Sequence, residues 1–172
     1  MNPAGFEAGG PLTGSARFAY FGAMTDPHRF LILADGDFSP MTSKTANSVI
    51  RYRPERVVGV VDRVFAGKAV QDVLGFGGAI PVVATMAAGL ALQPTAVLIG
   101  IAPAGGRLPD EWRAGLAEAL DAGCDLWSGL HTFLSDDPVL GPKAKALGRT
   151  IHDVRRPPAH LPAVVAAAAP QA

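Results

Sequence analysis

The sequence predicts an α/β protein with a doubly wound, mostly parallel sheet of five or six strands. Short apolar runs, rich in Val, Ile and Leu, alternate with segments of helical character about six times along the chain. The runs are apolar almost throughout, which is typical of strands that are covered on both faces. Glycine, proline or aspartate closes most of them, as expected where a strand gives way to a helix. This alternation is typical of Rossmann-like domains.

The expected elements follow from these runs in chain order. The strands are predicted at 29–34, 56–62, 80–85, 96–101, 125–130 and 150–154, and the helices at about 43–52, 69–74, 86–92, from 109 onward, and 138–147. In the fourth helix, Trp112, Leu116 and Leu120 recur four residues apart and form a stripe that faces the core. Pro109 is expected at the first position of that helix.

Length and composition fit one domain with flanking segments. The 172 residues divide into an N-terminal arm at 1–28, the Rossmann-like domain at 29–158 and an Ala/Pro-rich tail at 159–172. Lys plus Arg equals Asp plus Glu at 15 each, so we expect neither nucleic acid nor an anionic membrane as a partner. Neither a signal peptide nor an apolar run of ~20 residues is found, so a cytoplasmic location is expected. We also expect a homo-oligomer, with the aromatic arm as one possible contact.

The single cysteine, Cys124, limits the chemistry available. It excludes an intramolecular disulfide and a thiolate zinc cluster, and it is expected to be an inert thiol in the core. The four histidines show no spacing typical of a metal site, so no metal is predicted.

The ligand site of a doubly wound sheet lies at the carboxyl ends of the strands, where the strand order reverses. In the usual order this point falls between the first and fourth strands, so loops 35–42 and 103–108 should face each other. Gly105, Gly106 and Arg107 then combine backbone amides with a cation, an arrangement that can receive a phosphate. An ordinary tight turn explains the same residues about as well.

Further candidates follow the other strands. Asp62 lies 26 residues after Gly36, near the position of the acid that binds a ribose in dinucleotide folds. The first loop has no GxGxxG motif, however, so NAD binding is weakly supported. The remaining cofactor candidates are Arg63, Lys44 and Thr45, and the substrate-side candidates are His131, Asp153 and Arg155. Asp136 and Asp137 are expected to be exposed or to cap the following helix.

Four segments together resemble a known family. They are YRPERVVGVVDRVFAGKAVQDVLGFGGAIPVVAT, LIGIAPAGGRLPDEWR, SGLHTFLSDDP and IHDVRRPP. They resemble the N-terminal half of the D-glutamate N-acetyltransferase family, over about residues 30–158. The resemblance implies a Rossmann-like domain joined to a C-terminal P-loop NTPase-like domain, and in at least one branch the transfer of acetyl from acetyl-CoA to D-glutamate. This sequence has no P-loop motif and stops where the second domain is expected.

Three functions therefore stay open at this point. The chain can be the ligand-binding half of an acetyltransferase-like enzyme that needs a P-loop domain in trans. It can be a stand-alone module that binds acetyl-CoA or another phosphate-bearing nucleotide without catalysis. It can also be an interaction protein with no ligand in the crevice.

Overall fold

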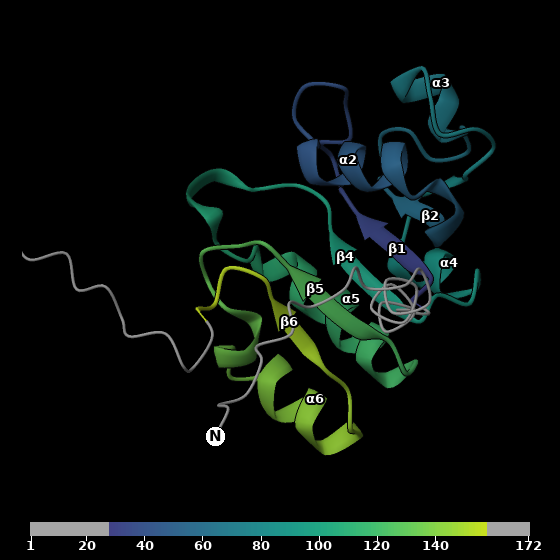
Figure 1. Cartoon of the computed structure of the whole chain (residues 1–172). Helices are drawn as coiled ribbons and strands as arrows, with labels where there is room; N and C mark the ends of the chain where they lie inside the picture. Colours follow the sequence, from purple (N-terminus) through teal and green to yellow (C-terminus); the bar gives the residue numbers. More distant parts are fainter. Residues whose placement is uncertain (1–27, 158–172) are drawn as a thin grey trace, which may run out of the picture.

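The computed structural model describes residues 28–157, and these form one layered α/β domain (Figure 1). The predicted tail and all of the predicted arm except His28 lie outside the described residues.

Six parallel strands form a single sheet in the order β3-β2-β1-β4-β5-β6. Their bounds are β1 Phe30–Leu33, β2 Val57–Val61, β3 Val82–Val83, β4 Ala96–Ile99, β5 Asp125–Ser128 and β6 Ile151–Asp153. Each strand falls inside the corresponding predicted run, and the doubly wound parallel fold is confirmed. The order places β1 at the centre, where it pairs with β2 on one side and β4 on the other.

Within residues 28–157, five α-helices and three short 3-10 helices connect the strands. They are α2 Lys44–Tyr52, α3 Val70–Leu74, α4 Met86–Leu90, α5 Asp110–Asp121, α6 Leu140–Leu147, η1 Pro54–Arg56, η2 Ala104–Gly106 and η3 Leu134–Asp136.

The helices lie on both faces of the sheet. Successive side chains of β1 point to opposite faces, so the β1 side chain that a helix approaches shows which face that helix covers. A Cβ on Gly89 of α4 would meet Leu31, whereas a Cβ on Gly100 would meet Ile32 and Ala46 of α2. The helices α4 and α2 therefore cover opposite faces. Because α5 contacts both α4 and α6, these three helices share one face.

On the other face, the helices of residues 28–157 cover only half of the width of the sheet. The helices α2 and α3 lie together, since a Cβ on Gly77 would meet side chains of both. Within residues 28–157, no helix lies over β5 and β6 on this face, which is turned toward the viewer in Figure 1. That half of the sheet carries Asp125, Trp127 and His152.

The core consists of the strands and the inner faces of the helices. Leu31, Ile32 and Val97 are completely buried, as are Leu116 and Leu126. Fully burying side chains of this size stabilises the fold by about 1.5–3 kcal/mol each. The stripe predicted in the fourth helix is confirmed, because Trp112, Leu116 and Leu120 are all buried.

Several element boundaries differ from the prediction, and two of the differences have a clear local reason. The third strand is reduced to Val82–Val83 because the segment before it pairs with the chain leading into α3, where the Val70 amide donates to the Ile80 carbonyl. Helix α5 begins at Asp110, because Pro109 is extended (φ −63°, ψ 139°) and serves as its N-cap.

Cys124 is buried, and its thiol contacts the Pro94 carbonyl at 3.4 Å. Burial, together with the nearby Asp125 carboxylate, raises the pKa of the Cys124 thiol, which suits the expected inert role. Among the described helices, none is long and apolar enough to cross a membrane.

Candidate functional site

The strand order reverses between β1 and β4. In doubly wound sheets the ligand crevice lies at the carboxyl ends of the strands at such a point, so the residues around the ends of β1 and β4 are the candidate site. The Gly100 amide donates to Leu33 at the end of β1, and its carbonyl accepts from the Ala46 amide at the start of α2. A Cβ at Gly100 would come within 2.8 Å of Ala46 Cβ, so glycine is required where α2 approaches β4. These contacts fix the start of α2 beside the end of β4.

Asp62 is completely buried at the end of β2 and has all of its acceptor positions occupied. One carboxylate oxygen accepts from the amides of Gly36 and Phe38, at 2.9 and 3.2 Å. The other accepts from Val64 and Phe65, both at 2.9 Å. The carboxylate thus ties the loop after β1 to the loop after β2, and in this arrangement it offers no exposed oxygen to a ribose.

Arg63 and Gly36 act together with Asp35. The Arg63 guanidinium is paired with the Asp35 carboxylate at 3.0 Å and lies over Gly36, which has a φ of +83°. The Arg63 side chain remains 66% exposed. It can therefore contact an anion at the rim only by sharing its charge with Asp35.

Lys44 and Thr45 are exposed in the first turn of α2. The loop that precedes them is rigid because the Ser39 carbonyl accepts from the Ser43 hydroxyl and the Asn47 amide, at 2.6 and 2.9 Å. Both side chains therefore stand on a fixed backbone next to the crevice.

The glycine turn after β4 packs against the loop after β5. The Gly106 carbonyl accepts from the amides of His131 and Thr132, at 2.9 and 3.3 Å. Any Cβ at Gly106 would collide with the His131 ring, and its φ of +63° also favours glycine. His131 thus supports this turn, and the structure brings the predicted residues Gly105, Gly106 and His131 together.

Arg107 follows the turn with an exposed side chain. Among residues 28–157, no acidic group pairs with its guanidinium, in contrast to Arg63, Arg113 and Arg156. The turn and the start of α5 are separate features, because the chain is extended from Arg107 (ψ 152°) to Pro109. The amides of the α5 N-terminus therefore do not form one cradle with the glycines.

Two of the predicted substrate-side residues, Asp153 at the end of β6 and Arg155 just after it, mainly stabilise loops. Asp153 accepts from the amides of Leu134 and Ser135, at 2.8 and 3.0 Å, and from the Ser135 hydroxyl at 2.6 Å. Arg155 donates to the Gly129 carbonyl at 2.7 Å. Both side chains therefore hold the segment that follows β5.

Three residues that no sequence motif singled out lie together elsewhere on the sheet. The ligand atoms of His28, Asp125 and His152 are all within 4.8 Å of one another. They come from the segment before β1, from β5 and from β6, so regular spacing along the chain cannot reveal them.

The parallel strand order, with its reversal between β1 and β4, and the helical layers define a Rossmann-like α/β domain. The model of a Rossmann-like domain of unknown function, DUF1611_N, matches residues 63–157, which is more than half of the chain. The chain belongs to this DUF1611_N family.

Three known proteins extend the comparison. The D-glutamate N-acetyltransferase of Tritonibacter scottomollicae is 34% identical over 123 residues, which cover 71% of this chain and 34% of that protein. The crystal structure of a DUF1611 family protein from Anabaena variabilis ATCC 29413 is 36% identical with a TM-score of 0.69, covering 78% of this chain and 39% of that chain. An amine dehydrogenase from Mycobacterium smegmatis is 17% identical with a TM-score of 0.51, over 74% of this chain and 39% of its own, and shares only the fold. The chain thus spans about a third of the length of the curated relative that it matches.

Proposed function

We propose that this chain is the Rossmann-like ligand-binding part of an acetyl-CoA-dependent N-acetyltransferase that acts on D-glutamate or a related amino acid. The 34% identity to a protein of that name carries the proposal. Because the chain spans only about a third of that relative, the complete activity requires a second domain, which we propose is P-loop NTPase-like and supplied in trans or by a longer chain.

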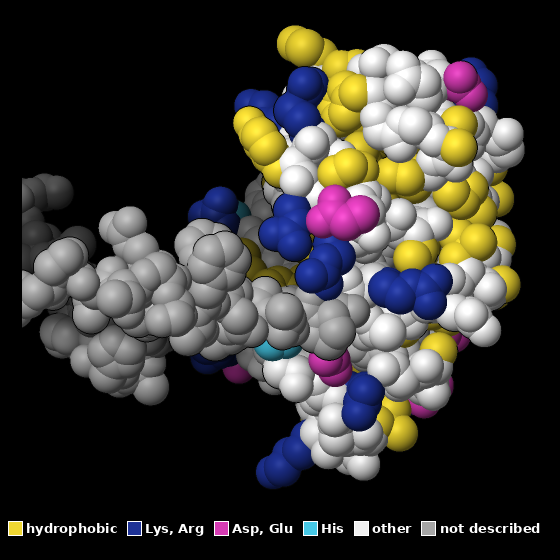
Figure 2. Space-filling model, turned by 45° about the vertical axis from the view of Figure 1, so that its right-hand side comes forward, with side chains coloured by type: hydrophobic (Ala, Val, Ile, Leu, Met, Phe, Trp, Pro, Cys, Tyr) yellow, Lys and Arg dark blue, Asp and Glu magenta, His cyan; other side chains and the backbone are white. Residues whose placement is uncertain are grey.

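The charges at the crevice support a phosphate-bearing ligand. Arg107 is an exposed guanidinium without an acidic partner in the described chain, and Lys44 is exposed at the start of α2. Arg107 lies in the loop that follows β4, and Lys44 is the first residue of the helix that follows β1. Figure 2 shows the basic side chains of one face in several separate groups, which suits a small anionic ligand better than a long polyanion.

The loop after β1 argues for acetyl-CoA over a dinucleotide. It contains one glycine, Gly36, and its backbone amides at Gly36 and Phe38 already donate to Asp62. A dinucleotide site of the usual kind needs a glycine-rich turn here whose amides face the pyrophosphate. Exposed apolar side chains at the same edge, Met41 and Val64, suit contact with a pantetheine chain or a second domain.

Arg107→Ala is predicted to weaken acetyl-CoA binding by about tenfold to a hundredfold. A hydrogen bond from a guanidinium to a phosphate contributes roughly 1.5–3 kcal/mol, at ~1.4 kcal/mol per decade of affinity. The stability of the variant should stay within about 0.5 kcal/mol of the original protein, because the side chain is exposed. Titration calorimetry with acetyl-CoA, NAD, NADP and ATP measures the affinities.

Lys145→Ala is the matched control, because it also removes one exposed positive charge, but from the last turn of α6. Equal acetyl-CoA affinity for Arg107→Ala and the original protein would exclude Arg107 as the anion contact.

The whole-protein proposal is tested by an assay with acetyl-CoA and D-glutamate. We expect no substantial transfer by the purified chain and restored transfer when the C-terminal part of a longer family member is added. Acetyl-CoA binding without transfer under both conditions would favour a binding module without catalysis. Robust turnover by the chain alone would exclude the requirement for a second domain.

A further inference from the structure

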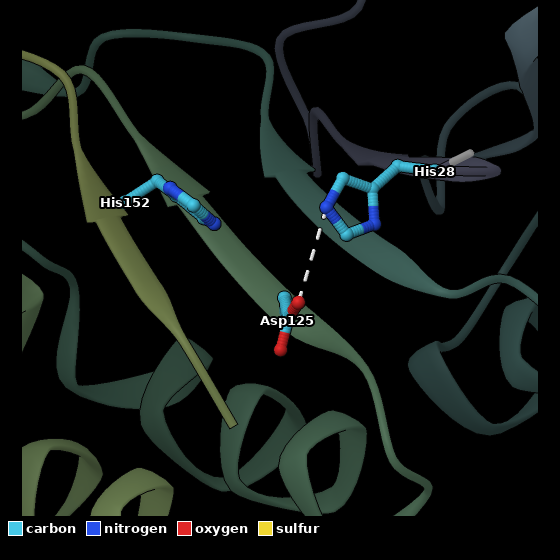
Figure 3. A group of neighbouring side chains, drawn as sticks. All are labelled: His28, Asp125 and His152. Carbon is cyan, nitrogen blue, oxygen red and sulfur yellow. Dashed lines mark ion pairs between the residues drawn. The ribbon is translucent and has the colours of Figure 1, made fainter. Parts of the chain in front are cut away.

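The side chains of His28, Asp125 and His152 converge on one point at the half of the sheet that no described helix covers (Figure 3). The register explains the convergence. Asp125 opens β5, two residues before Trp127, and Trp127 pairs with His152 on the neighbouring strand. Paired residues and residues two apart point to the same face of a sheet, so all three side chains project from one face. His28 reaches this face from the segment just before β1.

The geometry and the donor atoms fit a metal ion. His28 Nε2 lies 3.9 Å from Asp125 Oδ2, and the three ligand atoms are within 4.8 Å of one another. Two imidazoles and one carboxylate are typical zinc ligands, and ligand atoms around a tetrahedral zinc ion lie about 3.3 Å apart. Each pair of ligand atoms therefore has to approach by at most about 1.5 Å, which small side-chain rotations allow.

Neighbouring groups hold two of the three ligands in place. The Thr150 amide donates to Asp125 Oδ1 at 2.8 Å, which leaves Oδ2 directed toward His28. The His152 ring stacks on Trp127 with centroids 4.1 Å apart and an interplanar angle of 21°. Support of this kind orients metal ligands and raises affinity. All three ligands are partly buried, which reduces competition from water.

We propose that His28, Asp125 and His152 bind a zinc ion, with three protein ligands and one position open to water or another ligand. The site is distinct from the crevice, because His28 and Asp125 stand at the amino ends of their strands, whereas Arg107 follows a carboxyl end. It joins three segments that are far apart in the sequence. The bound ion would clamp the entry of β1 to β5 and β6.

The absence of a histidine motif in the sequence does not bear against this site. Metal motifs with short spacing describe ligands from one helix or one loop. Here each ligand comes from a different segment, and only the strand order β1-β4-β5-β6 brings them together.

Zinc binding by the full 172-residue chain tests the proposal. After treatment with a chelator and removal of the chelator, the protein is titrated with Zn²⁺ in competition with a chromogenic zinc indicator. We expect one zinc ion per chain and a zinc-dependent rise in the melting temperature. With Co²⁺ as a probe, we expect the visible absorption bands of a four-coordinate ion, and quenching of Trp127 fluorescence in a Trp112→Phe background.

Three variants and one control make the test specific to the site. Asp125→Asn keeps the acceptor for the Thr150 amide and removes the anionic ligand, while His28→Gln and His152→Gln each remove one imidazole. Each should lower zinc affinity by at least about tenfold, since loss of even an outer partner of a metal ligand costs 10–100-fold. His131→Ala, a histidine outside the cluster, should leave zinc affinity unchanged.

The variants remain interpretable if one of them folds poorly. Circular dichroism and the melting temperature without zinc identify such a variant, and the two others then decide. Zinc binding that persists in the folded variants, or that is lost equally in His131→Ala, overturns the proposal. Failure of the original chain to bind Zn²⁺ above the level of a triple variant also overturns it.

Discussion

Four backbone N–H groups converge on the Asp62 carboxylate from the loops after β1 and β2. From the sequence alone, an aspartate at the end of this strand fits either of two roles, binding a ribose or binding the neighbouring loops. Its complete burial favours the second, since no oxygen is left for a ligand. A buried carboxylate is stable only with such a set of partners.

Asp62→Asn is predicted to destabilise the fold by about 2–4 kcal/mol. The amide NH₂ that replaces one carboxylate oxygen would face two N–H donors, and two charge-assisted hydrogen bonds would be lost. Urea unfolding measures the change. Asp37→Asn, in the same loop but exposed, should stay within about 0.5 kcal/mol of the original. Normal stability of Asp62→Asn together with weakened ligand binding would instead indicate a ribose contact.

At the scale of single elements, Asp137 determines how α6 begins. One of its carboxylate oxygens accepts from the amides of Val139 and Leu140, at 2.9 and 3.0 Å, and the other accepts from Arg113 of α5 at 3.0 Å. Burial opposes ionisation, but the two amides and the Arg113 guanidinium outweigh it and lower the pKa of Asp137. Asp137 thus holds the two amides that lead into α6 and is buried, although Val139 rather than Asp137 is the N-cap residue of the helix.

The lowered pKa of Asp137 predicts a stability that decreases in acid. The contribution is complete above the unfolded-state pKa of about 3.9 and is lost as the pH falls through the lower pKa of the folded protein. Asp137→Asn keeps a capping oxygen but loses the pairing with Arg113. The difference in unfolding free energy between the two proteins should therefore be largest near pH 7 and shrink toward pH 3. A difference that does not change with pH, measured by urea unfolding, would contradict this assignment.

The elements were predictable from the sequence, whereas their ends depended on contacts made in the folded protein. The run at 80–85 is apolar enough for a full strand, yet hydrogen bonds to the segment before α3 reduce it to two residues. In the sequence, Pro109 fits the first position of a helix and the position just before a helix equally well. Only its ψ of 139° in the structure shows that it takes the second.

At the scale of the whole molecule, the strand order predicts where hydrogen exchange is slow. The strands β2, β1, β4 and β5 have a neighbour on each side, whereas β3 and β6 are edge strands of two and three residues. The amides of Val57–Val61 and Ala96–Ile99 should exchange last, and those of β3 and β6 first. Mass spectrometry after timed exchange measures this order, and equal protection of β6 and β4 would contradict it.

Of the candidate site, only the position of its loops relative to the strands was predictable. Parallel strands with the common order imply a crevice between β1 and β4, and Gly105, Gly106 and Arg107 do lie in the loop after β4. What each side chain binds was not predictable, because Asp62 and Asp153 are engaged by amides from distant loops. The cluster of His28, Asp125 and His152 likewise depends on strand order.

The central place of β1 also has a consequence for how the chain is made. Phe30 pairs with Ala96, which a ribosome adds 66 residues later. At ~5–20 residues per second, β1 emerges with one edge unpaired for about 3–13 s, although β2 becomes available sooner. Three of its four residues are completely or almost completely buried in the finished sheet. During synthesis this apolar edge is open to pairing with other nascent chains until β4 is made.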